Sequence, residues 1–217
     1  STGTSWDIGN TTRSALAAFE TTGHPYCGAT DSNSAGNGSI MRLAPVPMFF
    51  RRQTTEAIEM AADSSRTTHG TRTAVDACRY LASLIVGALE GRTKEELTAA
   101  NSVPYRDCFS ELPLAPEIEE IRQGSFRRRH PPEIRGSGYV VHTLEAALWA
   151  FHNSENFRDG CLKVVNLGED ADTTGAVFGQ LAGAYYGESA IPSEWRAQLH
   201  GHDLIVRLAG ELWNRRV

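Results

Sequence analysis

Apolar residues recur at intervals of three and four along most of the chain, which is the spacing of one face of an α-helix. The widest apolar stripe falls within 71–90. A shorter one occupies "TTRSALAAFETTG", where Ala15, Leu16, Ala18 and Phe19 share a face and Gly23 is placed to end the helix. Alternation typical of strands is weak and confined to "GYVVH", which continues into the helical pattern of "TLEAALWAF". The pattern therefore predicts an all-α protein.

The same spacing predicts where the other helices lie. Residues 1–217 contain no repeat and no break in composition, so we expect most simply a single domain, with two small domains as the alternative. Segment 101–135 is the least regular and is expected to run over the surface. Beyond the first helix, we expect one to begin near Pro45, and others at 54–66, 71–90, 94–100, 115–123, 138–152, 155–166, 173–187 and 201–215.

Composition and charge exclude several classes of protein. The chain is 41% hydrophobic and 22% charged, an ordinary globular balance, and its formal net charge is −5. This balance argues against a nucleic-acid partner or an anionic membrane surface, which usually require a basic excess. A local exception is "RRRHPP", Arg127 to Pro132, which is either a solvated loop or an anion site.

The four cysteines are far apart and form no CxxC pair. Cys78 and Cys161 lie in apolar stretches, where a free cysteine behaves as a small hydrophobic residue. No apolar stretch approaches the length of a membrane helix, and no signal peptide is visible. These features predict a reduced compartment and a cytoplasmic protein without a membrane partner.

Two aspartates precede a helical pattern in "GEDADTTGAVFGQLAGAYYG", residues 168–187. Asp170 and Asp172 can aim several oxygens at one point, and hard divalent cations prefer such ligands. The alternative is that Asp172 caps a helix that begins at Thr173. An EF-hand is excluded because its twelfth position, which needs a bidentate glutamate, is Leu181.

Glycine recurs every fourth residue behind these aspartates, at Gly175, Gly179, Gly183 and Gly187. Each glycine costs about 1 kcal/mol relative to alanine inside a helix. A face made of glycines allows another helix to approach closely. We therefore expect a tightly packed central helix that serves as a platform for the aspartates.

The segment "SNSAGNGSIMR", residues 32–42, is rich in small residues and leads towards a helix. Such a loop can turn successive backbone N–H groups towards an anion, although a plain turn is the alternative. It has neither the lysine of a Walker loop nor the preceding strand of a dinucleotide-binding fingerprint. His69, in "SSRTTHGTR", is either part of a site or an ordinary histidine at a helix end.

Taken together, several segments resemble the ADP-ribosylglycohydrolases, and among these the bacterial dinitrogenase-reductase-activating glycohydrolases. The resemblance is carried, in order, by "SWDIGNTTRSAL", "GNGSIMRLAPVPMF", "SSRTTHGTRTAVDACRYL", "GYVVHTLEAALWAF" and "NLGEDADTTGAVFGQLAGAYYG". It implies an all-α fold, two Mg²⁺ or Mn²⁺ ions, and hydrolysis of the glycosidic bond between ADP-ribose and a protein side chain, often arginine. ADP-ribose or an ADP-ribosylated protein is then the expected partner.

The resemblance also implies roles for single residues. It makes Asp170, Asp172 and Thr173 metal ligands, His69 a phosphate or ribose contact, and Tyr139 an aromatic neighbour of the nucleotide. Asp7 and Asn10 resemble positions at the scissile end, where Asp7 would hold the departing guanidinium or assist proton transfer. The expected pyrophosphate cradle consists of Ser34, Ala35, Gly36, Asn37 and Gly38, with Met41 beside it.

One feature of the family has no counterpart in the sequence. Family members carry an N-terminal region with a T-D-D-T motif and an upstream acidic residue, whereas "DIG" here begins at Asp7. We therefore expect residues 1–217 to be the C-terminal portion of such an enzyme, whose missing N-terminal segment is supplied in a longer polypeptide or as a separate chain. The alternatives are a non-catalytic ADP-ribose-binding module and a purely structural role.

Overall fold

The computed structural model describes residues 8–99, 105 and 107–215, whose regular secondary structure consists of helices. No strand forms among them, and two isolated bridges, Ala29–His69 and Gly36–Tyr139, are the extended pairings. The prediction of an all-α fold is confirmed. The helices are α1 (Asn10–Thr22), α2 (Pro45–Phe49), α3 (Thr54–Arg66), α4 (Arg72–Leu89), α5 (Lys94–Thr98), α6 (Pro116–Arg122), α7 (Val140–His152), α8 (Phe157–Val165), α9 (Ala171–Tyr186), α10 (Ser193–Gln198) and α11 (His202–Asn214).

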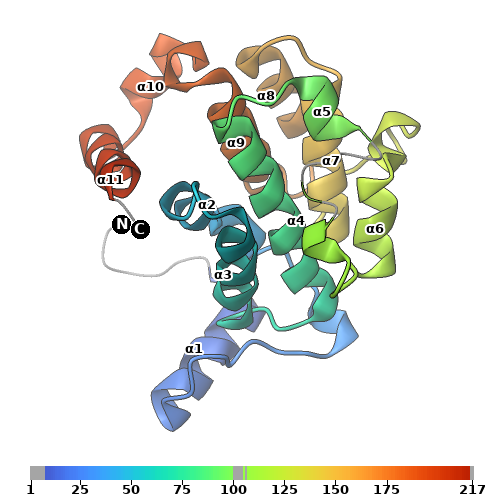
Figure 1. Cartoon of the computed structure of the whole chain (residues 1–217), viewed down its shortest axis with the longest axis vertical. Coiled ribbons are helices and arrows are strands. Elements are labelled where there is room, and N and C mark those ends of the chain that lie inside the picture. The colour runs from blue at the N-terminus through green and yellow to red at the C-terminus, as the bar shows by residue number, and fades with distance from the viewer. Residues whose placement is uncertain (1–7, 100–104, 106, 216–217) are drawn as a thin grey trace.

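Helix α4 lies at the centre of the bundle (Figure 1). Every residue from Ala74 to Ala88 is buried, which explains why the apolar stripe in this segment is so wide. Helices α3, α7 and α9 pack directly against α4, and α8 packs against both α7 and α9. The hydrophobic core is therefore continuous from α3 to α8.

A buried ion pair ties α4 to the irregular segment that follows α5. Asp76 and Arg79 are both buried, and Arg79 Nη1 lies 2.8 Å from Asp76 Oδ1. The second carboxylate oxygen accepts the backbone N–H of Ala115 at 2.8 Å, and Arg79 donates to the carbonyl of Leu112 at 3.1 Å. Because these groups have partners, the pair is tolerated in the core.

Most helix boundaries lie within one or two residues of those predicted. The segment 54–66 is predicted without error, and Gly23 ends α1 with a φ of 68° and an N–H that donates to Phe19. Helix α10 was not predicted, because it has six residues and none of them is buried. "GYVVH" contributes one bridge at Tyr139 before α7 begins.

The predicted packing of another helix on the glycine face is not found among the described residues. A Cβ atom at Gly179 or Gly183 would meet no atom of the described residues within 4 Å, and Gly187 lies beyond the end of α9. Only Gly175 has a close neighbour, at 3.1 Å from Val165 Cγ1. The buried face of α9 instead carries the larger side chains, namely Thr173, Thr174, Val177, Phe178, Leu181 and Ala182.

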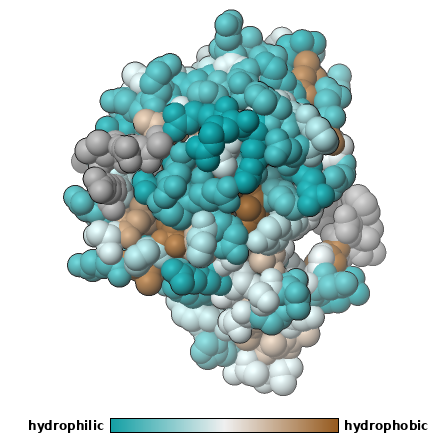
Figure 2. All heavy atoms as spheres, turned by 90° about the vertical axis from the view of Figure 1, so that its right-hand side faces the viewer, coloured by the Kyte–Doolittle hydropathy of each residue, from teal (hydrophilic) through white to brown (hydrophobic). Residues whose placement is uncertain are grey.

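The arginine-rich segment lies on a largely hydrophilic face of the molecule (Figure 2). Arg129 forms ion pairs with Glu120 at 2.5 Å and with the buried Glu145 at 2.8 Å. The charge of Arg129 is therefore balanced by glutamates of the same chain. This favours a structural loop over an anion-binding site at Arg127 to Pro132. In the described residues, no helix is both long and apolar enough to cross a membrane.

Helices α1 and α11 have few buried side chains. Ala15 is the one buried residue of α1, which extends away from the bundle in Figure 1. Helix α11 has no buried residue and leans on α2, where the guanidinium of Arg51 lies 4.3 Å from the ring centroid of Trp213. These two helices belong to the periphery rather than the core.

Candidate functional site

The first part of the candidate site is a close contact between two loops. The Ala29–His69 bridge is closed by the N–H of Gly70, which donates to Ala29 O at 2.9 Å. Gly28 donates to Arg66 O at the same distance. A Cβ on Gly28 would lie 2.6 Å from two backbone nitrogens, and one on Gly70 would lie 2.5 Å from Gly28 O. Glycine is needed at both positions because the backbones touch.

The second part joins the small-residue loop 34–38 to the segment before α7. Asn37 N–H donates to Gly138 O at 3.2 Å, and Val140 N–H donates to Ala35 O at 3.1 Å. These bonds flank the Gly36–Tyr139 bridge. The loop is thus fixed between the His69 turn on one side and Tyr139 on the other.

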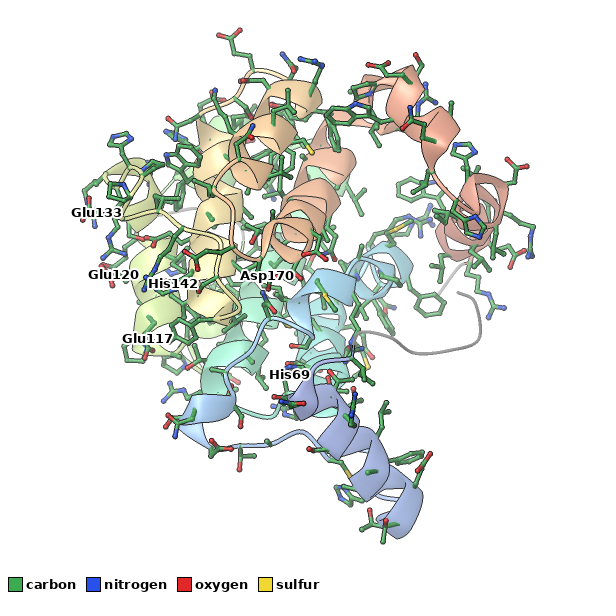
Figure 3. All side chains as sticks on the ribbon, turned by 180° about the vertical axis from the view of Figure 1, so that it is seen from behind. His69, Glu117, Glu120, Glu133, His142 and Asp170 are labelled. Carbon is green, nitrogen blue, oxygen red and sulfur yellow. The ribbon has the colours of Figure 1, made fainter. Side chains whose placement is uncertain are left out.

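Asn37 connects this loop to the N-terminus of α9. Its amide nitrogen lies 2.7 Å from Asp170 Oδ2 and 2.9 Å from Thr143 Oγ1, and its side chain is buried. The backbone N–H of Asp170 donates to Gly136 O at 2.7 Å. Asp170 is therefore held from two sides, and Asn37 orients a carboxylate rather than lining the surface. In Figure 3, Asp170 lies near the middle of the molecule and His69 lies below it, towards α1.

The alternative that Asp172 caps the helix is wrong. Helix α9 begins at Ala171, so Asp170 is the N-cap residue and Asp172 lies in the first turn. The Asp170 side chain makes no capping hydrogen bond. Asp172 is exposed, and no partner for its carboxylate is found in the described part of the chain. Thr173 is buried, with Oγ1 3.7 Å from Met41 Sδ.

These residues fit part of a metal site. Mg²⁺ takes about six oxygen ligands, and Asp170, Asp172 and Thr173 supply two carboxylates and one hydroxyl. Among residues 8–99, 105 and 107–215, no group of three or more His, Cys, Asp or Glu side chains is placed to hold a metal ion. These three side chains supply fewer ligands than such an ion takes, so the described residues alone do not complete a metal site.

His69 is buried beside the loop, with 3% of its surface exposed. Burial and the nearby charge of Arg42 lower the pKa of its imidazole to about 4, so the ring is neutral at physiological pH. A Cβ on Gly38 would lie 2.8 Å from His69 Cε1, and one on Gly36 would lie 3.4 Å from Nε2. Gly38 therefore leaves room for the ring, whereas a Cβ on Gly36 would make an ordinary contact.

The loop 34–38 was expected to turn its backbone N–H groups towards an anion, but several of these groups already have partners. Three of them donate within the protein: Ser34 to Asp31 O, Gly36 to Ser34 O, and Asn37 to Gly138 O. The Ser34 hydroxyl donates to the carboxylate of Asp31, and Ala35 is buried in the core. Two of these three bonds are local turns and the third joins the loop to Gly138, so most of the N–H groups expected to face an anion are already used.

Tyr139 is partly buried and packs edge-on against His142, with ring centroids 5.1 Å apart. Ser137 Oγ lies 2.8 Å from His142 Nδ1 and accepts the N–H of Tyr139 at 3.3 Å. Burial raises the pKa of Tyr139 and lowers the pKa of His142. Ser137 and His142 were not predicted, because nothing in their spacing distinguishes them from an ordinary turn and helix start.

The scissile-end residues are less well placed. Asp7 lies outside the described residues. Asn10 is exposed at the start of α1. Two residues further along, Thr12 Oγ1 would lie 3.5 Å from a Cβ on Gly38, so this end of α1 does reach the loop.

Comparison with known proteins identifies the family of the chain. A profile of the ADP-ribosylglycohydrolase family matches residues 1–217. The chain is 42% identical to "ADP-ribosylarginine hydrolase Tri1" of Pseudomonas putida (strain GB-1), over 98% of this chain and 55% of that protein. It is 29% identical to "ADP-ribosyl-[dinitrogen reductase] glycohydrolase" of Rhodospirillum rubrum, over 89% of this chain and 60% of that protein.

A solved structure supports the same grouping. It is a chain of an "ADP-ribosylglycohydrolase-related protein complex", and it matches with a TM-score of 0.83 and 42% identity over 94% of this chain and 68% of its own length. The protein described here belongs to the ADP-ribosylglycohydrolase family. It spans a little over half the length of the curated relatives that it matches.

Proposed function

We propose that this chain forms the core of a metal-dependent hydrolase that removes ADP-ribose from arginine side chains of proteins. The relatives named for this activity are up to 42% identical to the chain, which supports the linkage to arginine. Because the chain spans only about half of their length, the activity, the metal and the substrate are proposals for this protein.

The single observation that carries the proposal is the hydrogen bond between Asn37 and Asp170. It joins residues 133 positions apart, at a distance of 2.7 Å. It holds loop 34–38, which we call the glycine loop and which packs against His69, next to the aspartates at the N-terminus of α9. A nucleotide sugar needs both halves, since its phosphates and ribose require donors whereas a cation that binds it requires carboxylates.

Each residue has a task in this reaction. Water adds a hydroxyl group to the anomeric carbon of ADP-ribose, and its remaining proton goes to the departing guanidine nitrogen. The transition state resembles an oxocarbenium ion, as in other glycoside hydrolysis. His69 donates a hydrogen bond to a ribose or phosphate oxygen, Tyr139 packs beside the nucleotide, and Asn37 fixes the orientation of Asp170.

Asp170, Asp172 and Thr173 would hold one divalent cation, Mg²⁺ or Mn²⁺. Such an ion stabilises negative charge and lowers the pKa of water. Two complete coordination shells need more ligands than these three residues supply. We propose that the other ligands come from the part of the relatives' length that this chain does not span, either in the same polypeptide or as a separate chain.

The test combines metal binding with release of ADP-ribose. Asp172→Asn should lower Mn²⁺ binding, measured by calorimetry, at least tenfold, because one charged ligand is lost. The matched control is Asp203→Asn, which changes an exposed aspartate in the first turn of α11. Equal Mn²⁺ affinity of the Asp172 variant and the control would contradict the assignment.

Release of ADP-ribose from an ADP-ribosylated arginine peptide is then followed with Mn²⁺ and with a chelator. Residues 1–217 should bind ADP-ribose and show little turnover, and an added N-terminal segment from the Pseudomonas putida relative should increase the rate. Binding without turnover in both samples would favour the alternative, a non-catalytic ADP-ribose-binding module. If neither sample binds ADP-ribose, the proposed function is wrong.

A further inference from the structure

The imidazole of His69 is held by a short chain of polar side chains. Arg42 Nη2 lies 2.8 Å from Thr68 Oγ1, and Thr68 Oγ1 lies 2.9 Å from His69 Nδ1. Thr68 and His69 are both buried. Because unpaired polar atoms are costly in such a place, each hydrogen in this chain needs an acceptor.

The positions of the hydrogens follow from the chemistry of the groups. A guanidinium group has donors and no acceptor, so Arg42 must donate to the Thr68 oxygen. The Thr68 hydroxyl then keeps its own hydrogen for another partner, and the acceptor that the described residues offer is His69 Nδ1. A ring nitrogen that accepts carries no proton, so in the neutral ring the proton is on Nε2.

We propose that Arg42 and Thr68 are positioning residues that fix His69 in its Nε2-protonated neutral form, so that Nε2–H serves as a hydrogen-bond donor at the glycine loop. Ideal Cβ atoms on Gly36 and Gly38 would lie 3.4 Å and 3.1 Å from Nε2, so both glycines border this edge of the ring. The donor suits an oxygen acceptor that need not be fully charged. This proposal rests on the proposed function only for the identity of that acceptor, a ribose or phosphate oxygen of ADP-ribose.

The backbone of His69 is held by a second, buried chain. Ser65 Oγ lies 2.9 Å from His69 O, which can only accept, so the Ser65 hydroxyl donates to it. Ser39 Oγ, 2.9 Å away, must therefore donate to Ser65, and Cys78 Sγ, 3.6 Å from Ser39 Oγ, donates in turn to Ser39. Ring and backbone are thus fixed independently, and Ser39, which directly follows loop 34–38, ties this loop to His69.

The charge state of the ring agrees with the proposed hydrogen positions. Burial and the positive charge of Arg42 both disfavour the imidazolium form and lower the pKa of His69. A protonated ring would also place an Nδ1–H against a hydroxyl whose oxygen already accepts from Arg42. In the neutral Nε2-protonated form, the Thr68 hydroxyl hydrogen has Nδ1 as its acceptor, and Nε2–H is left to face the glycine loop.

Nitrogen NMR of histidine tests the proposal on the intact chain without any ligand. In uniformly ¹⁵N-labelled protein at pH 7, His69 Nε2 should resonate as a protonated ring nitrogen and Nδ1 as an unprotonated one. The signals are assigned by their loss in His69→Gln. A proton on Nδ1 in the wild-type protein would overturn the proposal.

Two variants test whether Arg42 and Thr68 cause this state. Arg42→Gln frees the Thr68 oxygen to accept from Nδ1–H, so both ring nitrogens should shift towards averaged values. Thr68→Val keeps the shape of the side chain but removes the hydroxyl donor, and it should shift the ring signals in the same way. Thr68→Ser keeps the hydroxyl group and should retain the wild-type ring signals. The matched control is Thr67→Val, since Thr67 also accepts from Arg42, at 3.2 Å, but has no contact with His69. If neither Arg42→Gln nor Thr68→Val changes the ring signals, the proposal is wrong.

Calorimetry with ADP-ribose separates this proposal from the proposed function. The affinity should fall about tenfold in Thr68→Val, the value of one hydrogen bond, and stay within twofold in Thr67→Val. Wild-type protein that has the predicted ring signals but does not bind ADP-ribose would reject the proposed function and leave the hydrogen-bond chain intact. Unchanged affinity in a Thr68→Val protein with altered ring signals would show that Nε2–H does not contact the ligand.

Discussion

Glycines gather in two regions of this molecule, and their surroundings differ. In the loops around His69, added side-chain atoms would collide: a Cβ on Gly70 would lie 2.5 Å from Gly28 O, and one on Gly38 would lie 2.8 Å from His69 Cε1. Along α9, a Cβ on Gly179 or Gly183 would meet nothing within 4 Å in the described residues. The loop glycines are required by close contacts within this chain, whereas the helix glycines are not.

The contrast shows that glycine spacing alone does not reveal packing. Four glycines at intervals of four form one face of a helix, but the interval does not say whether that face points inwards. In α9 the core is filled by Val177, Phe178 and Leu181 instead. Burial of large apolar side chains is worth about 1.5–3 kcal/mol each, so they decide which face turns inwards.

The largest expected effect is at the contact between loops. Gly70→Ala should destabilise the protein by about 3 kcal/mol, because the new methyl group overlaps a carbonyl oxygen that cannot move without breaking the Ala29–His69 bridge. Urea denaturation measures the change. The control is Gly9→Ala, whose Cβ has nothing within 4 Å and which should alter stability by less than about 1 kcal/mol. Equal effects of the two substitutions would show that the loop contact is dispensable.

A smaller effect is expected where a glycine borders the His69 ring. Gly38→Ala should weaken ADP-ribose binding about tenfold, because the methyl group displaces a ring that Thr68 holds in place. Gly36→Ala should have less effect, since its Cβ would be 3.4 Å from Nε2, an ordinary contact distance. Calorimetry of both variants makes the comparison, and a larger loss for Gly36→Ala would reverse the assignment.

The fold followed from the sequence more fully than the site did. Helix positions depend on local periodicity and caps, so segment 54–66 and the stop at Gly23 were predicted well. The site depends on contacts between residues more than a hundred positions apart. Asn37 was expected to touch the ligand, and the structure shows it bonded to Asp170 and Thr143. No pattern in one sequence identifies such partners.

The support for His69 illustrates the same limit. Thr68 is adjacent in sequence and could have been suspected as a partner, but Arg42 reaches it from 26 positions away. The free N–H groups expected in residues 34–38 also depended on unknown neighbours. Ala35, Gly36 and Asn37 form backbone contacts with residues 138–140 that only the folded chain brings close.

The contrast between the two groups of glycines also predicts that substitutions on α9 increase stability. Gly179→Ala and Gly183→Ala should each stabilise residues 1–217 by about 0.5–1 kcal/mol, since alanine has the higher helix propensity and the added Cβ has space. Thermal and urea denaturation measure this gain. The contrasting control is Gly160→Ala in α8, whose Cβ would lie 2.4 Å from Phe178 Cζ and which should destabilise the protein. A loss of stability in the two α9 variants would restore the buried glycine face.

The smallest expected effect is a loss of stability at acidic pH that is absent at neutral pH. Because burial and Arg42 lower the pKa of folded His69 to about 4 from 6.5, the unfolded chain binds the proton more readily. The stability due to neutral His69 is therefore complete above pH 6.5 and declines as the pH falls towards 4. Urea midpoints between pH 7 and 4.5 should fall more steeply for the wild type than for His69→Gln. Parallel curves would contradict the lowered pKa.

The reactivity of Cys78 can measure the rate at which the contact between α4 and the segment around Ser39 opens. Its thiol is buried and its pKa is raised to about 11, whereas the reactive species is the thiolate. Cys27, Cys108 and Cys161 are partly accessible, so a thiol reagent modifies them first. Modification of Cys78 requires separation of α4 from Ser39, and hence of the chain of hydroxyl groups that holds His69. The slow phase of labelling, followed by mass spectrometry, therefore times the transient opening of the candidate site in the native protein.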